Sequence, residues 1–186
     1  MTITELLAPT YKQMLQALSG WLKKAKETGA DADALMGARL APDMFPLATQ
    51  VRFACIQAHE GAYRLRGEAR PPVIDALHKE GADGGEQPGT VDAALARIDE
   101  ALAVLDALPA DALDAGAKKP LALELPIGLA FDFDGERYVR DWALPQLYFH
   151  INMAYAILRN QGVAIGKADY VPHMFAYLRP GTGPTS

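Results

Sequence analysis

The sequence predicts an all-α fold of four long helices, with a small β-hairpin before the last of them. Apolar residues recur at three- and four-residue spacing in four separate segments, whereas alternation of apolar residues is confined to 121–133. The chain has 186 residues, half of them hydrophobic, which suits one domain with a sizeable core. We expect a single domain over residues 1–178 and a flexible tail over 179–186.

The first helix is expected to end at about Thr28, with Gly29 as the residue that follows its C-cap. Proline is typical of a first helical turn, so Pro9 places the start at about Ala8. The apolar face of this helix is formed by Tyr11, Met14, Leu15, Leu18, Leu22 and Ala25. A one-turn helix that ends at Met36 follows in the connector.

A second helix is expected from an N-cap at Asp43, with Pro46 in its first turn, to Gly67. Its apolar face comprises Leu47, Val51, Ala54, Ala58, Ala62 and Leu65. Residues 68–89 are rich in Gly, Pro and charge, and this composition predicts a long mobile loop with at most a helical turn over 73–78.

The third helix is expected to be capped by Thr90 and ended by Pro109. Its apolar face comprises Val91, Leu95, Ile98, Leu102, Leu105 and Leu108. The alternation at Leu121, Leu123, Leu125, Phe131 and Phe133 predicts the β-hairpin. The last helix, 145–160, is apolar nearly all round, which is typical of a helix flanked on several sides.

Composition excludes several functional classes. A net charge of -5 argues against a nucleic-acid partner, and no apolar run approaches the length of a membrane span. The single cysteine, Cys55, lies in an apolar helical stretch and is expected to be a buried small hydrophobe rather than a reactive thiolate. No export signal opens the sequence, so we expect a cytoplasmic protein.

The sequence contains no nucleophile elbow, Walker loop, dinucleotide fingerprint or two-histidine zinc motif. The histidines are therefore the main remaining candidates for catalytic or binding residues. His78 falls in the polar loop and His173 lies near the C-terminal tail, so both are expected to be solvated, and helical geometry also places His59 toward solvent. His150 is different, because it faces the interior of the last helix with Gln146 one turn before it.

Several segments resemble a bacterial family of unknown function in the DinB-like superfamily of four-helix bundles. They are residues 38–47 with Gln50 and Val51, then 144–150, 154–163 and 166–170. The resemblance covers about residues 4–171, with 75–89 as extra length. It implies a DinB-like four-helix bundle with the hairpin before the last long helix.

Members of that superfamily typically hold a divalent metal with three histidines, one on the second helix and two on the last, and some are thiol-dependent transferases or isomerases. The resemblance places Gln50 at the first of these positions and Gln146 and His150 at the other two. Amides are poor ligands for zinc or nickel, so the resemblance implies a vestigial metal site in which His150 is the candidate ligand.

Two functions remain open. In the first, Gln50, Gln146 and His150 form a hydrogen-bonded polar pocket without a metal, which binds either a small molecule or nothing. In the second, the protein is a metal-dependent enzyme acting on a small thiol or carbonyl substrate, with zinc or nickel on His150 and with Asp43, Gln57 or a second subunit completing the site. A stress-linked interaction protein is a third class, suggested by superfamily association alone. A two-fold homodimer that buries part of the first or last helix is expected.

Overall fold

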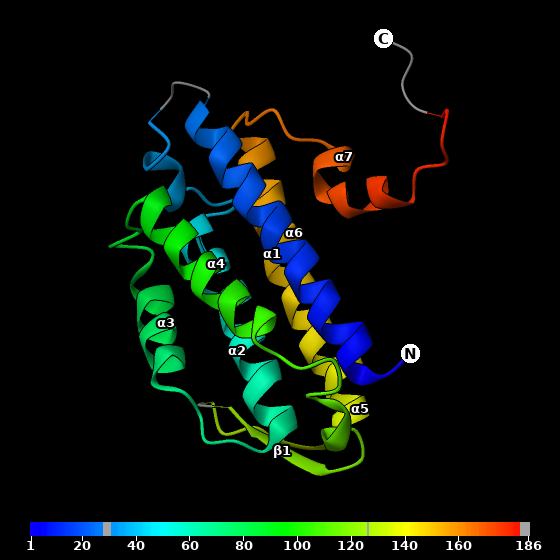
Figure 1. Ribbon diagram of the computed structural model, residues 1–186. Helices are drawn as coiled ribbons and strands as arrows, with labels where there is room; N and C mark the ends of the chain where they lie inside the picture. The colour runs from blue at the N-terminus through cyan, green and yellow to red at the C-terminus, as the bar shows by residue number, and fades with distance from the viewer. Residues whose placement is uncertain (28–30, 126, 183–186) are drawn as a thin grey trace.

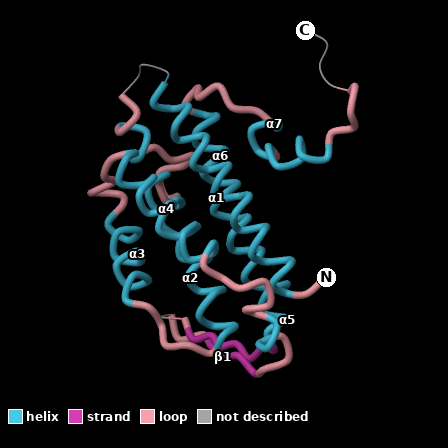
Figure 2. The backbone as a smooth tube through the Cα atoms, in the orientation of Figure 1, coloured by secondary structure: helices cyan, strands magenta, loops and turns pink. Residues whose placement is uncertain are grey.

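Four long helices pack side by side, and a two-stranded hairpin lies across one end of them (Figures 1 and 2). The computed structural model describes residues 1–27, 31–125 and 127–182. The long helices are α1 (Ile3–Glu27), α2 (Leu47–Arg66), α4 (Val91–Asp106) and α6 (Leu144–Asn160). In Figure 1, α1 and α4 lie in front, with α6 behind α1 and α2 behind α4. The predicted all-α fold with a small hairpin is confirmed.

Helix α1 begins at Ile3, five residues before the predicted start at Ala8. Thr2 and Glu5 form a capping box: the Glu5 N–H donates to Thr2 Oγ1, and the Thr2 N–H donates to Glu5 Oε2. Pro9 consequently lies inside the helix, where it removes one backbone donor. The predicted end, at Thr28 and Gly29, lies outside the described residues.

The remaining helix ends agree with the prediction at most positions. Gly67 adopts the left-handed conformation after α2, with φ 69°, and Thr90 Oγ1 accepts the Ala93 N–H at the start of α4. The one-turn helix in the connector is η1 (Ala34–Gly37). Helix α2 begins after Pro46 rather than at Asp43, so the predicted N-cap is wrong by one turn.

The predicted loop over 68–89 is wrong, because its middle forms the helix α3 (Pro72–Asp83). Two of the glycines that suggested a loop are the points where α3 meets α2. A Cβ on Gly81 would collide with the Phe53 ring, and one on Gly84 would lie 2.6 Å from Thr49 Oγ1. That hydroxyl donates to the Gly81 carbonyl at 2.7 Å. The glycines thus permit close approach between helices instead of marking flexibility.

Strands β1 (Pro120–Glu124) and β2 (Ala130–Asp134) pair antiparallel, with Leu123 opposite Phe131. The hairpin is preceded by the short turn η2 (Asp114–Gly116). After β2 the chain continues as one helical path into α6, through α5 (Gly135–Arg137) and a six-residue π-helical segment, η3 (Tyr138–Ala143). The hairpin is therefore joined directly to the last long helix.

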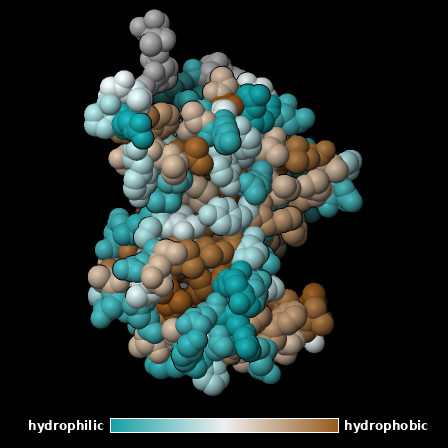
Figure 3. All heavy atoms as spheres, turned by 90° about the vertical axis from the view of Figure 1, so that its right-hand side faces the viewer, coloured by the Kyte–Doolittle hydropathy of each residue, from teal (hydrophilic) through white to brown (hydrophobic). Residues whose placement is uncertain are grey.

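The C-terminal segment packs against α1 and then extends away from the bundle (Figure 1). Helix α7 (Lys167–Tyr170) is fixed by Trp21, whose Nε1 donates to the Asp169 carbonyl at 2.8 Å. The following η4 (Pro172–Tyr177) exposes several large apolar side chains. Figure 3 faces this side of the molecule and shows hydrophobic residues gathered in a hollow. None of the helices in the described ranges combines the length and apolar character of a membrane span.

Candidate ligand-binding cavity

A cavity of about 750 Å³ lies between α2, α3, the hairpin and the start of α6. Helix α3 and the segment before it, which sequence reasoning assigned to a loop, supply one wall. The lining residues are Phe53, Ile56, Gln57, Glu60, Arg64, Arg70, Asp75, His78, Ala82, Leu123, Glu124, Leu125, Trp142, Gln146 and His150. The volume and the mixture of apolar walls with a few polar groups are typical of sites for small organic ligands.

His150 is held in one orientation by a hydrogen bond to α2. Its Nδ1 lies 2.9 Å from Gln50 Oε1, and the Gln50 amide nitrogen donates to the Phe45 carbonyl at 3.3 Å. Because the amide nitrogen faces a carbonyl, the amide oxygen must face the imidazole, so Nδ1 carries the proton and donates. The lone pair is then on Nε2, and no hydrogen bond among the described residues involves this nitrogen.

Burial keeps this imidazole neutral. His150 is 7% exposed, and removal from solvent lowers its pKa to about 4. At neutral pH the side chain therefore presents an uncharged hydrogen-bond acceptor in the cavity wall. Such a nitrogen can accept a hydrogen bond from a ligand N–H or O–H, or it can coordinate a metal ion.

Gln146 and Gln57 provide amide groups on the same cavity, one from each of the facing helices. Gln146 lies one turn before His150 on α6, yet no hydrogen bond in the described part of the chain joins it to His150 or Gln50. The expected three-residue hydrogen-bonded cluster is thus reduced to the pair of Gln50 and His150. Gln57 is 6% exposed, and its Oε1 has no partner.

Phe53 separates two histidines at the cavity wall. Its ring packs edge-on against His150 at 5.3 Å between centroids and against His78 at 5.9 Å. His78 is exposed, as expected from the sequence, but it projects from a helix at the cavity rather than from a mobile loop. The sequence signal for a packed helix at this position was the apolar pair Ile74 and Leu77, which are fully buried on the inner face of α3.

The charged groups of the cavity wall are paired with one another. Arg64 contacts the Glu60 carboxylate at 3.2 Å and also donates to the Ala122 carbonyl. Arg70 pairs with Asp75 at the more exposed edge. Arg64 Nε is buried without a hydrogen-bond partner, although the guanidinium as a whole is paired with Glu60, and the exposed Glu124 has no ion pair among the described residues.

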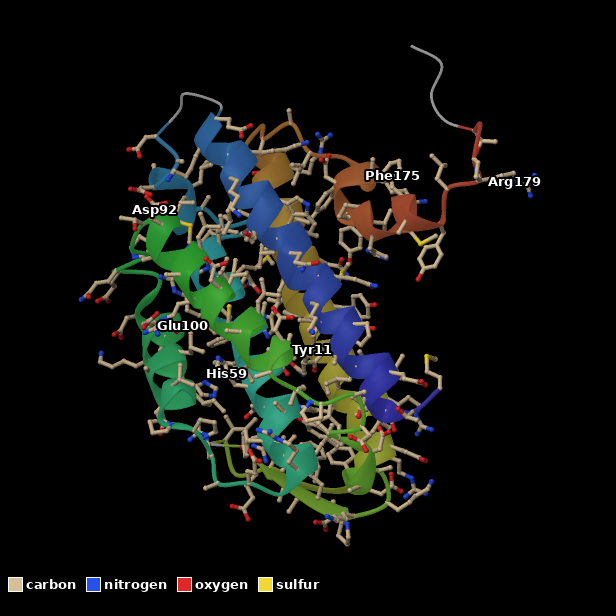
Figure 4. The ribbon with its side chains drawn as sticks, in the orientation of Figure 1. Tyr11, His59, Asp92, Glu100, Phe175 and Arg179 are labelled. Atoms are coloured by element: carbon tan, nitrogen blue, oxygen red, sulfur yellow. The ribbon has the colours of Figure 1, made fainter. Side chains whose placement is uncertain are left out.

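His59 does not point to solvent as predicted. It is 5% exposed, its Nε2 has no partner, and burial lowers its pKa. Figure 4 shows His59 on α2 and Glu100 on the neighbouring α4. Helix α2 contacts α1, α3, α4 and α6, so even its polar edge is covered. The prediction assumed that α2 has one buried face. His173, also expected to be solvated, is half-buried.

The residues present do not fit a catalytic zinc or nickel centre. No three His, Cys, Asp or Glu side chains of the described residues are grouped to hold a metal ion. Gln50 and Gln146 are amides, and the Gln50 oxygen already accepts from His150. Asp43 does not line the cavity. Cys55 is fully buried, as predicted, and burial raises its pKa to about 12, so it is no thiolate ligand or nucleophile at neutral pH.

Comparison with known families and structures agrees with the fold. Residues 3–171 match the family model described as a domain of unknown function, DUF1993. The chain is also similar to the crystal structure of a DinB family member protein from Shewanella denitrificans. The two are 28% identical with a TM-score of 0.73, over 98% of this chain and 96% of the other. No curated protein sequence matches the chain.

Proposed function

Because the chain belongs to the family of the domain of unknown function DUF1993 and has a DinB-like fold, we propose that it binds a small organic molecule in the cavity beside His150. The observation that carries this proposal is the orientation of His150, whose Nδ1 is engaged by Gln50 and whose Nε2 forms no hydrogen bond with any described residue. A fixed imidazole with a free lone pair, in a largely apolar cavity, is a group that orients a ligand.

The energetics support this interpretation. A buried polar atom without a partner costs about 1–3 kcal/mol, and the cavity wall holds more than one such atom. Gln57 Oε1 and Trp142 Nε1 are both buried without partners. A bound ligand, together with small side-chain movements, offers hydrogen bonds that the protein alone does not supply.

The alternative is a metal-dependent enzyme that acts on a small thiol or carbonyl substrate. That reaction needs a metal held by several protein ligands with one position left open. His150 Nε2 is one suitable donor, but the described residues group no second and third His, Cys, Asp or Glu with it. The observations therefore favour ligand binding over metal-assisted chemistry.

A blocking variant tests the proposed binding. Ala82 lies on α3 in the cavity wall, so Ala82→Trp adds a large side chain at the cavity, whereas Ala103→Trp adds the same side chain to an exposed position on α4. The probe is a panel of single-ring organic molecules, and binding is followed by NMR shifts of the Gln57, Gln146 and His150 side chains. We expect shifts in the wild type and in Ala103→Trp and none in Ala82→Trp. Shifts that persist in Ala82→Trp, or no shifts with any probe, would contradict the proposal.

A further inference from the structure

We infer that the ligand of this cavity is an uncharged, flat ring with an N–H or O–H donor beside a hydrogen-bond acceptor, as in a cyclic amide. This inference rests on the proposed function and specifies the chemical class of the ligand. It follows from three features of the wall: the pairing of its charges, the direction of its hydrogen bonds and the character of its apolar surface.

The charge of the ligand follows from the ion pairs. An anion would need a cation whose charge is not already neutralised. Arg64 Nε has no hydrogen-bond partner, but the Arg64 guanidinium is paired with Glu60, and Arg70 is paired with Asp75. A cation would need a free carboxylate, and the one lining carboxylate outside these pairs in the described chain, Glu124, is exposed. Charged ligands would therefore lose hydration without gaining a buried partner of opposite charge that is unpaired, and that loss is much greater for an ion than for a neutral molecule.

The hydrogen bonds of the ligand follow from His150 and Gln146. Because Gln50 fixes the proton on Nδ1, Nε2 can only accept, so the ligand must donate to it. Gln146 lies one turn away on α6, a spacing at which two side chains reach the same small molecule. Its amide can donate to an acceptor on that ligand. A donor and an acceptor close together on one ring satisfy both residues.

The shape of the ligand follows from the aromatic and aliphatic side chains around these groups. Phe53 and Trp142 line the cavity together with Ile56, Leu123 and Leu125. Phe53 is fixed between His150 and α3, where Gly81 leaves room for its ring. Rigid aromatic walls favour a flat ring that can pack against them over a flexible chain that must be ordered on binding.

Four single-ring probes test the inference on the wild-type protein. These are 2-pyridone, which has the N–H and C=O pair; N-methyl-2-pyridone, which lacks the donor; benzoate; and benzylammonium. Dissociation constants are measured by NMR titration of the cavity side chains. We expect 2-pyridone to bind most tightly and N-methylation to weaken binding about three- to tenfold, the effect of one neutral hydrogen bond.

A pair of histidine variants assigns that effect to His150. His150→Phe keeps an aromatic ring but removes the acceptor, and His59→Phe makes the same change at a buried histidine outside the cavity. We expect His150→Phe to weaken 2-pyridone binding about three- to tenfold and to leave N-methyl-2-pyridone unchanged, while His59→Phe changes neither.

Two outcomes would overturn the inference in different ways. If benzoate or benzylammonium binds in the cavity as tightly as 2-pyridone, or if N-methylation has no effect, the ligand class is wrong and the proposed binding function stands. If none of the four probes shifts the cavity side chains while the broader panel does, the class is again wrong. If no molecule of either set does so, the proposed function fails as well.

Discussion

The imidazole of His150 on α6 donates from Nδ1 to the side-chain oxygen of Gln50 on α2, at 2.9 Å. Gln50 is itself oriented by its hydrogen bond to the Phe45 carbonyl. This chain of two hydrogen bonds joins two of the long helices and fixes which imidazole nitrogen is available to the cavity. The proposed binding of a ligand beside His150 depends on this relationship.

The stability of the protein should fall as the pH is lowered through the range set by His150. An unfolded histidine has a pKa near 6.5, whereas burial lowers the pKa of His150 to about 4. Above about pH 6.5 neither state takes up a proton at this position. Between about pH 6.5 and 4 the unfolded state does so and the folded state does not, so the free energy of unfolding falls, by on the order of 3 kcal/mol at most.

Urea denaturation of the wild type and of His150→Phe measures this contribution. The difference in unfolding free energy between about pH 7 and pH 5 should be smaller in His150→Phe, since the variant lacks the group that titrates. Other buried histidines, including His59, contribute in both proteins and cancel in the comparison. Equal pH dependence in the two proteins would show that His150 is not held neutral by burial.

The packing of α3 on α2 predicts opposite effects for the same substitution at two glycines. Gly81→Ala should destabilise the protein by about 1–3 kcal/mol, because its Cβ would collide with the ring of Phe53. Gly20→Ala should stabilise it by roughly 0.5–1 kcal/mol, because Gly20 is exposed within α1 and no atom lies within 4 Å of the added Cβ. Thermal or chemical denaturation checks both. A neutral Gly81→Ala would mean that α3 does not pack closely on Phe53.

A two-fold homodimer that buries part of α1 or α6 remains our prediction for the assembly, and the exposed aromatic side chains favour α6. Tyr148 and Phe149 are adjacent on α6 and are 38% and 54% exposed, which is unusual for two neighbouring large aromatic side chains. Light scattering should give a particle of twice 20.0 kDa. Replacing both residues by Glu should give a monomer, whereas the same double change at the exposed Ile127 and Leu129 of the hairpin turn should not. A wild-type monomer at micromolar concentration would contradict the prediction.

The sequence predicts the long helices well because their burial follows a regular period. Thr90 and Gly67 mark helix ends through local interactions, and the structure confirms both. Helix α3 was missed because Gly81 and Gly84 have a tertiary role: they admit the side chains of α2, which no local pattern reveals. Local composition therefore gave the wrong interpretation for that segment.

The candidate site was only partly predictable for the same reason. Helical spacing correctly placed His150 in the interior, and the resemblance to DinB-like proteins grouped it with Gln50 and Gln146. The hydrogen bond from His150 to Gln50 crosses 100 residues of sequence, and it depends on how α2 and α6 pack. His59 was misplaced because four helices surround α2, whereas an amphipathic pattern assumes that one face remains in water.

Whether the cavity is complete without a metal is tested by the melting temperature of tag-free protein with and without a strong metal chelator, measured for the wild type and for His150→Phe. If the polar cavity is complete without a metal, the chelator leaves the melting temperature of both proteins unchanged. If the chelator lowers the melting temperature of the wild type but not that of His150→Phe, a metal bound at His150 stabilises the folded state. That result would contradict a metal-free binding cavity and favour the metal-dependent enzyme.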